Sequence, residues 1–136
     1  MQLVLDTNVL VSGMLSASGP PGQILNWVLQ GTLSPVICPS ILAEYRDVCL
    51  REKIGIPSGK SNIILNWMSG YSVGYQPLPW PCDLPDPDDG VFLALAKAFD
   101  VPMVTGNLRH YPDDIRDGVV VMNPLEFVEL LRKLEA

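Results

Sequence analysis

The sequence is poor in the residues that cross-link a small chain or bind soft metal ions. Its 136 residues include three cysteines, Cys38, Cys49 and Cys82, and a single histidine, His110. Because the number of cysteines is odd and no two stand at C-x-x-C spacing, we expect neither a disulfide framework nor a thiolate zinc site, and a reducing cytoplasm is the expected compartment. One histidine also excludes a multi-histidine metal site, and no G-x-S-x-G motif accompanies it.

Long apolar runs and an excess of basic residues are lacking as well. No apolar segment approaches the roughly 18 residues that a membrane span needs, and the N-terminus lacks the basic region of a signal peptide. Nine lysines and arginines stand against fifteen acids, and the net charge of −6 by itself argues against nucleic-acid binding through a basic surface. With 48% apolar and 18% charged residues, the chain is expected to form one domain over residues 1–136, without a membrane partner.

Short apolar runs alternate with helical stripes along the chain, which is typical of a layered α/β protein. Leu3–Leu5 is a continuously apolar run that ends at an acid, as in a parallel strand covered on both faces. Five prolines in segment 77–87 predict a stiff, non-helical connector. We therefore expect a three-layer α/β/α sandwich with a mostly parallel central sheet. The expected strands are 3–5, 35–38, 72–75, 103–105 and 119–122, and the expected helices are 20–30, 39–49, 61–70, 88–99 and 125–134.

Polar side chains stand where these strands end. In open α/β sheets ligands bind beyond the carboxyl ends of the strands, so residues at those positions are the first candidates for a site. The topology brings segments that are far apart in the sequence to this one edge. The candidates are Asp6-Thr7-Asn8 after the first strand, Glu44 in the helix after the second, Asp86, Asp88 and Asp89 before the helix that leads to strand 103–105, and Thr105-Gly106-Asn107 at the end of that strand.

This carboxylate cluster predicts a site for a hard divalent cation. Clustered carboxylates raise one another's pKa values unless a cation lies between them, and oxygen ligands suit Mg²⁺ or Mn²⁺. Metal sites of this kind commonly act on phosphates. Without the five candidate acids the chain keeps ten acids against nine bases, so the remaining surface is nearly neutral and compatible with a nuclease. The basic side chains that could contact phosphates near this edge are Arg46, Arg51, Lys53, Arg109 and Arg116.

Each candidate also has a plainer explanation. Asp6 stands in a turn-friendly tripeptide, and the helix dipole favours acids at the start of any helix. Glu44 could occupy a solvated helix face, although it falls at the edge of the apolar stripe and Ser40 stands one residue too far away for a capping box. Asn107 follows a glycine, as in a turn. We expect His110 to be structural or a substrate contact rather than a metal ligand.

Four segments together resemble the motifs of the PIN domain family. Their order and spacing cover nearly the whole chain. The resemblance is closest to the bacterial and archaeal branch of toxin components from toxin–antitoxin pairs, and it implies a PIN-like fold. The matching segments are LVLDTNVLVSGML at 3–15, PSILAEYRDVC at 39–49, DPDDGVFLALA at 86–96 and VTGNLRHYP at 104–112.

The resemblance implies an endoribonuclease that uses Mg²⁺ or Mn²⁺. By position in the motifs, Asp6, Glu44 and Asp89 correspond to the family's first three acids, and Asp86 is an accessory acid of this branch. The fourth acid of many members falls at Asn107, a departure that leaves open whether one or two metals bind. The resemblance further implies an RNA substrate, a small antitoxin protein that blocks the site, and a homodimer or higher homo-oligomer.

Our leading hypothesis assigns each candidate a role. Asp6, Glu44 and Asp89 hold the cation and position or deprotonate the attacking water, with Asp86 as a further metal ligand and Asn107 as a further catalytic residue. In-line attack by water would leave a 5′-phosphate and a 3′-hydroxyl. The residues expected to contact the substrate are Thr7, Asn8, Thr105, Arg46 and Arg109.

Two other functions are weighed against this hypothesis. A catalytically silent PIN-like module that binds RNA or protein is favoured by Asn107, which stands where an acid is expected. Another aspartate-based phosphate enzyme is less favoured. A phosphatase with an aspartate nucleophile would need a second aspartate where Asn8 stands, and a receiver domain would need a lysine where the chain reads Asn107-Leu108-Arg109.

Overall fold

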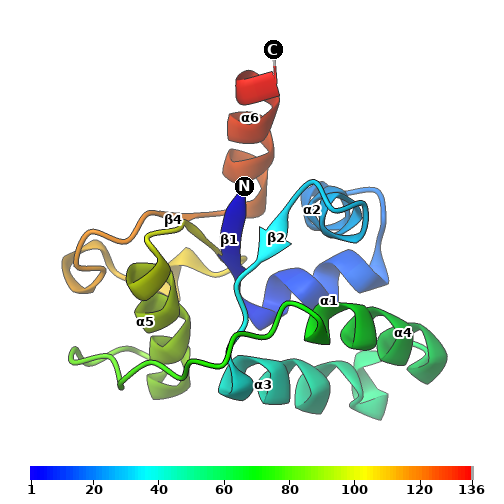
Figure 1. The fold of residues 1–136 in the computed structure, drawn as a ribbon, viewed down its shortest axis with the longest axis horizontal. Helices are drawn as coiled ribbons and strands as arrows, with labels where there is room; N and C mark the ends of the chain where they lie inside the picture. The colour runs from blue at the N-terminus through cyan, green and yellow to red at the C-terminus, as the bar shows by residue number, and fades with distance from the viewer. Residues whose placement is uncertain (136) are drawn as a thin grey trace.

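A computed structural model describes residues 1–135, which form a four-stranded sheet with strand order β2-β1-β3-β4. All three strand pairs are parallel, and their registers pair Leu3 with Pro35, Val4 with Met103, and Val104 with Met122. Figure 1 shows the strands at the centre of the molecule with helices around them. The expected parallel α/β architecture is thus confirmed. The strands are β1 (Gln2–Leu5), β2 (Ser34–Pro35), β3 (Met103–Val104) and β4 (Val121–Met122).

The helices follow the expected pattern with one addition. Helix α1 directly follows β1, where the sequence suggested a turn at Asp6-Thr7-Asn8, because Asp6 caps the helix by accepting a hydrogen bond from the Thr7 amide. Helix α1 carries no charged residue, and its more exposed side includes the apolar residues Val11 and Leu15, so it shows no polar face by which to recognise it. The helices are α1 (Thr7–Leu15), α2 (Pro20–Leu29), α3 (Pro39–Cys49), α4 (Ser58–Ser69), α5 (Gly90–Phe99) and α6 (Pro124–Glu135), with short 3₁₀ turns η1 (Glu52–Ile54), η2 (Pro87–Asp89), η3 (Leu108–His110) and η4 (Asp113–Ile115).

The outer strands are shorter than their apolar runs suggested. Pro35 has no amide hydrogen, which an edge strand tolerates, and pairing continues through its neighbours Ser34 and Val36, which donate to the Met1 and Leu3 carbonyls. The expected strand at 72–75 is reduced to an isolated parallel bridge between Ile37 and Ser72. Prolines stand at alternate positions from residue 77 onward. Because proline has no amide hydrogen to donate, the ladder does not extend into that segment.

The core is a single cluster that runs through the sheet and the helices around it. The side chains of Leu3–Leu5 in β1 are fully buried, and α5 packs against β1 and β3 with Phe92, Leu93 and Leu95 inside. Helices α1 and α2 approach closely at Gly13, where an added Cβ would lie 2.8 Å from the Pro21 carbonyl oxygen. Fixing these contacts fixes where β1 ends and α1 begins, which is where the first candidate acid lies.

The carboxyl ends of the strands lie toward α1, α3 and the start of α5. Both chain ends lie on the opposite side, where α6 projects at the top of Figure 1. Helix α3 packs against α1, α4 and α5, so it covers the same edge from below. Within residues 1–135, we find no helix with the length and apolar character that spanning a membrane requires.

Candidate functional site: a carboxylate cluster at the carboxyl end of the sheet

Asp6 is held rigidly at the end of β1. Its side chain is almost fully buried, at 5% exposure, and Oδ1 accepts a hydrogen bond of 2.8 Å from the Thr7 amide. Oδ2 accepts hydrogen bonds from Thr105 Oγ1 at 2.8 Å, Tyr111 OH at 3.1 Å and Asn8 Nδ2 at 3.3 Å. Burial raises the pKa of Asp6, and the donors Thr105, Tyr111 and Thr7 counteract part of that rise by stabilising the carboxylate. Four hydrogen-bond donors therefore orient the Asp6 carboxylate.

The loop after β3 is tied to the loop after β1 by polar side chains. Asn8 Oδ1 accepts the Gly106 amide at 2.8 Å, and an added Cβ at residue 106 would lie only 3.1 Å from that oxygen. The Thr105 hydroxyl accepts the Asn107 amide at 3.0 Å while donating to Asp6. A side chain at residue 106 would therefore press against the Asn8 carboxamide, and the hydrogen bonds join the two loops.

Glu44 lies on α3 at the edge of the same cluster. Its Oε2 accepts a hydrogen bond from the Thr7 hydroxyl. Burial raises the pKa of Glu44, and the charges of Asp6, Asp89 and Asp88 raise it further, whereas the Thr7 hydrogen bond lowers it. Helix α3 is fixed to β1 through the next residue, since Tyr45 is fully buried and donates from its hydroxyl to the Leu5 carbonyl at 2.5 Å.

Asp89 brings the third acid from the turn before α5. Asp89 as a whole residue is 8% exposed, and its Oδ2 lies 2.8 Å from His110 Nδ1. Burial and the charges of Asp6 and Asp86 together raise the pKa of Asp89 to about 6, although the hydrogen bond to His110 counteracts part of the rise. Burial and then the charges of Asp6 and Asp89 raise the pKa of Tyr111 far above its ordinary range, so its hydroxyl keeps its proton and remains a donor to Asp6.

Three carboxylates from distant parts of the chain thus converge. The Thr7 amide donates to Asp6 and the Thr7 hydroxyl donates to Glu44, and the charge of Asp6 contributes to the raised pKa of Asp89, so the three acids lie at the same end of the sheet. Within residues 1–135 their oxygen atoms do not all lie within 4.8 Å of one another, a spacing that only Asp86, Asp89 and His110 meet. Within residues 1–135, no lysine or arginine forms an ion pair with any of the three. Buried carboxylates without cationic partners repel one another, and an oxygen-rich set of this kind fits a hard divalent cation. The donor set therefore fits Mg²⁺ or Mn²⁺.

Asp86, Asp89 and His110 form a second grouping that shares Asp89 with the first. One donor atom from each of the three side chains lies within 4.8 Å of the other two. Asp86 caps η2 by accepting the Asp88 amide at 3.0 Å through Oδ1. The sequence predicted Asp86 and Asp89 as ligands of one site, but it did not predict that His110, in the loop after β3, would lie beside them.

The residues expected to contact substrate are placed less uniformly. Thr105 is fully buried and Thr7 nearly so, and both hydroxyls serve the acids instead of facing outward. Arg46 is two residues from Glu44 on α3, hence about 200° around the helix, so its exposed side chain lies on the opposite edge from the cluster. Arg109 is exposed on η3 at the cluster's margin. The Asn107 carboxamide makes no hydrogen bond to any residue within 1–135.

Two tyrosines of the site were missed by reasoning from the sequence. Tyr45 and Tyr111 are fully buried, and each uses its hydroxyl to fix a backbone or an acid at the end of β1. Periodicity identifies Tyr45 only as a core position. Tyr111 directly follows η3 and lies in no predicted helix or strand. The one available signal was its hydroxyl, which needs a hydrogen-bond partner when buried, next to a polar motif.

A pocket of about 570 Å³ opens beside the cluster. Glu44 and Asp88 line one side, and the proline-rich connector lines the other with Leu78 and Trp80. Trp80 is anchored by donating from Nε1 to the Ile115 carbonyl at 3.0 Å, and its Cβ closely approaches Gly90. The stiff connector therefore keeps an apolar wall next to the acids.

Comparisons with known proteins agree on the family. A family model described as PIN domain matches residues 2–109. The uncharacterized protein MJ1680 of Methanocaldococcus jannaschii is 30% identical over 144 residues, which cover 98% of this chain and 93% of that protein. Among solved structures, FitAB bound to an IR36 DNA fragment has a TM-score of 0.58 at 22% identity, covering 91% of this chain and 95% of that one. FitAcB from Neisseria gonorrhoeae has a TM-score of 0.56 at 23% identity, covering 92% and 99%.

The two solved structures share the fold, and the family model covers most of the chain, including the segments that carry Asp6, Glu44 and Asp89. The protein belongs to the PIN domain family.

Proposed function

We propose that the protein is a Mg²⁺- or Mn²⁺-dependent endoribonuclease. The observation that carries the proposal is the grouping of Asp6, Glu44 and Asp89 at one end of the sheet, where Thr7 hydrogen-bonds both Asp6 and Glu44 and no lysine or arginine of the described chain pairs with any of the three acids. Such an arrangement costs stability unless it holds a cation, and PIN domains are generally nucleases.

Each acid has a distinct part in the proposed reaction. When bound, the divalent cation would neutralise charge on the phosphate and activate a water. Asp6 is oriented by its four donors, so it is suited to be the fixed ligand. Glu44, with its raised pKa and position at the rim, is suited to accept the proton of the attacking water. In-line attack would leave a 5′-phosphate and a 3′-hydroxyl.

The substrate we propose is single-stranded RNA. The pocket beside Glu44, with its apolar wall of Leu78 and Trp80, is suited to a base turned out of a strand, which a duplex cannot offer. Because net charge is −6, few basic side chains hold the phosphates, and binding should be modest and sensitive to salt. Arg109 and Asn107, at the margin of the cluster, are the residues we propose to contact the strand.

We further propose that the protein is a toxin component that pairs with a small antitoxin and forms a homodimer or higher homo-oligomer. The resemblance of its four motifs to that branch supports the proposal, as does the fold it shares with FitAB and FitAcB. Exposed apolar side chains on α4, Ile63 and Trp67, are consistent with an interface to another chain.

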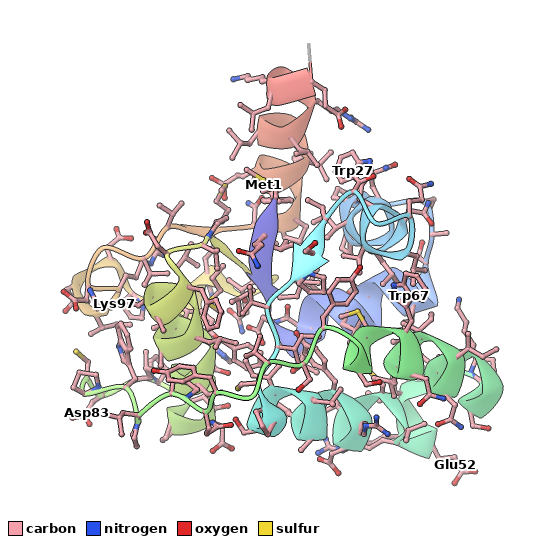
Figure 2. All side chains as sticks on the ribbon, in the orientation of Figure 1. Met1, Trp27, Glu52, Trp67, Asp83 and Lys97 are labelled. Atoms are coloured by element: carbon pink, nitrogen blue, oxygen red, sulfur yellow. The ribbon has the colours of Figure 1, made fainter. Side chains whose placement is uncertain are left out.

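The direct test is cleavage of single-stranded RNA by the Asp6→Asn variant in Mn²⁺. We expect the variant to lose cleavage while its circular dichroism spectrum is unchanged. Lys97→Ala is the matched control. Lys97 lies in the last turn of α5, at the end of the helix away from Asp89 (Figure 2), and pairs with Asp117. Undiminished cleavage by Asp6→Asn would refute the proposal.

A silent binding module is the second candidate, supported by Asn107 in place of a fourth acid. Calorimetric titration separates the two functions. The nuclease should bind Mn²⁺ measurably, whereas no binding at millimolar Mn²⁺ would favour the silent module.

A further inference from the structure

We propose that His110 is a nitrogen ligand of the cation, and that Asp86, Asp89 and His110 together make a mixed nitrogen–oxygen position beside Asp6 and Glu44 that favours Mn²⁺ over Mg²⁺. The inference rests on the proposed metal dependence and deepens it. It assigns a role to the chain's only histidine, which the sequence led us to expect outside the ligand set.

The spacing of the three side chains matches the coordination sphere of a single ion. Ligand atoms at about 2.0–2.2 Å from an ion lie roughly 3 Å apart when adjacent and about 4.2 Å apart when opposite. His110 Nδ1 and Asp89 Oδ2 are 2.8 Å apart, as adjacent ligands are, and the three donor atoms lie within 4.8 Å of one another. For one ion to bind all three, the proton shared between His110 Nδ1 and Asp89 Oδ2 has to leave, so that both atoms become ligands instead of hydrogen-bond partners.

Each donor comes from a backbone position that is already fixed. Asp89 ends η2 and precedes α5, and its side chain is buried. Asp86 uses Oδ1 to cap η2, which leaves Oδ2 free to turn toward the other two. His110 ends η3 and is followed by Tyr111, which is anchored to Asp6. Asp89 therefore faces His110 on one side and the charge of Asp6 on the other, so its carboxylate is shared between the two groupings.

The proposed role also explains the departure at Asn107. A carboxamide there is a neutral and weak ligand compared with the acid that the motif usually carries. His110 lies three residues later in the same loop and restores a strong donor, with nitrogen replacing oxygen. Imidazole suits transition-metal ions, whereas Mg²⁺ prefers oxygen ligands throughout, so the exchange should shift preference toward Mn²⁺.

The test is pulsed electron paramagnetic resonance of Mn²⁺ bound to the full, untagged chain. Because the chain has one histidine, any ¹⁴N coupling typical of a directly bound imidazole must come from His110. We expect that coupling in the wild type and its loss in His110→Gln, together with a loss of Mn²⁺ affinity of about tenfold or more and a smaller loss for Mg²⁺. Arg109→Gln, at the neighbouring exposed position, should keep both the coupling and the affinity.

The outcomes separate this inference from the function on which it rests. Bound Mn²⁺ without imidazole coupling would overturn the role of His110 as a ligand, leaving it as a hydrogen-bond partner of Asp89, while metal dependence would stand. Failure of Mn²⁺ to bind the wild type at millimolar concentration would overturn both. If His110→Gln unfolds, the coupling in the wild type still decides the question, because its presence supports the inference and its absence refutes it.

Discussion

Two pockets of nearly equal volume lie at opposite ends of the sheet. The first, of about 570 Å³, opens at the carboxyl end beside Glu44 and Asp88. The second, of about 550 Å³, lies at the amino end, lined by segments that lead into β3 and β4 and by Lys97, Asp117 and Leu130. Figure 2 labels Asp83 on the connector near the start of α5 and Lys97 toward the end of that helix, which marks the two regions.

The two ends of the sheet differ in the exposure and pairing of their charged side chains. At the amino end, Lys97 Nζ and Asp117 Oδ2 are 2.8 Å apart, with side chains 50% and 69% exposed, so the pair is solvated and neutralised. At the carboxyl end, Asp6 and Asp89 are buried and have no lysine or arginine partner within residues 1–135. Pocket volume therefore does not distinguish a functional end from an ordinary one. Buried carboxylates without a lysine or arginine partner among the described residues do distinguish the two ends.

The largest expected effect contrasts one acid from each end. Asp89→Asn should reduce Mn²⁺-dependent RNA cleavage by at least about 10²-fold, because it removes a carboxylate from a preorganised charged site. Asp117→Asn should leave the rate within about twofold of wild type, since its partner Lys97 is solvated. Steady-state kinetics on both variants provide the measurement. Equal losses in the two variants would remove the distinction between the ends.

A smaller effect is expected from the tyrosine that orients Asp6. Tyr111→Phe deletes a hydroxyl that donates to Asp6 at 3.1 Å, so Mn²⁺ affinity should fall by about tenfold in a calorimetric titration. Tyr45→Phe is the matched control, because that hydroxyl donates to the Leu5 carbonyl and to no acid. It should lower the free energy of unfolding by about 1 kcal/mol without weakening the bound cation. Equal affinity in Tyr111→Phe and wild type would show that Asp6 does not need this donor.

The stability of the cation-free protein should depend on pH through the buried acids. The pKa of Asp89 rises from 3.8 to about 6 on folding, and those of Asp6 and Glu44 rise too. Between pH 3.8 and 6 the folded state then binds a proton that the unfolded state has lost, so stability falls as pH rises through this window.

Thermal melts in chelator should therefore show a decline in Tm from pH 4 to pH 6.5 that is shallower in Asp89→Asn. Mn²⁺ should raise Tm more at pH 7.5 than at pH 5, because the cation competes with protons for the carboxylates. Identical pH profiles for the wild type and Asp89→Asn would mean that Asp89 ionises normally in the folded protein.

The smallest expected effect concerns the apolar wall of the first pocket. Leu78 is 84% exposed and lines that pocket, so Leu78→Ala should leave Tm unchanged. If a base docks there, KM for single-stranded RNA should rise by up to about fivefold, equivalent to roughly 1 kcal/mol of apolar contact, with kcat unaffected. An unchanged KM would place the substrate elsewhere on the acidic edge.

Much of the fold follows from local patterns. Continuous apolar runs such as Leu3–Leu5 identify buried parallel strands, and Pro39 correctly marks the start of α3. Helix α1 was not predicted because it carries no charge and has the apolar residues Val11 and Leu15 on its more exposed side, so it has no amphipathic pattern. The segment at 72–75 has the composition of a strand, but the prolines that follow limit it to one bridge.

The candidate site, like the fold, was predictable from the sequence only in part. The rule that ligands bind beyond the carboxyl ends of strands selects the segments that carry Asp6, Glu44 and Asp89, together with Asp86 and Asp88, without singling out Asp89. It cannot reveal that Thr105 would be buried against Asp6, or that His110 would lie 2.8 Å from Asp89, since these depend on how two loops pack. Helical geometry on α3, applied to Arg46 as well as to Glu44, would have separated the two in advance.

The central claim is that the acids at the carboxyl end of the sheet hold a divalent cation. Crystals of the full chain grown with Mn²⁺ and measured for anomalous scattering provide the most direct measurement. We expect a peak within bonding distance of the Asp89 carboxylate and none in the pocket beside Lys97 and Asp117. Crystals that contain Mn²⁺ at millimolar concentration but show no peak among Asp6, Glu44 and Asp89 would contradict the claim.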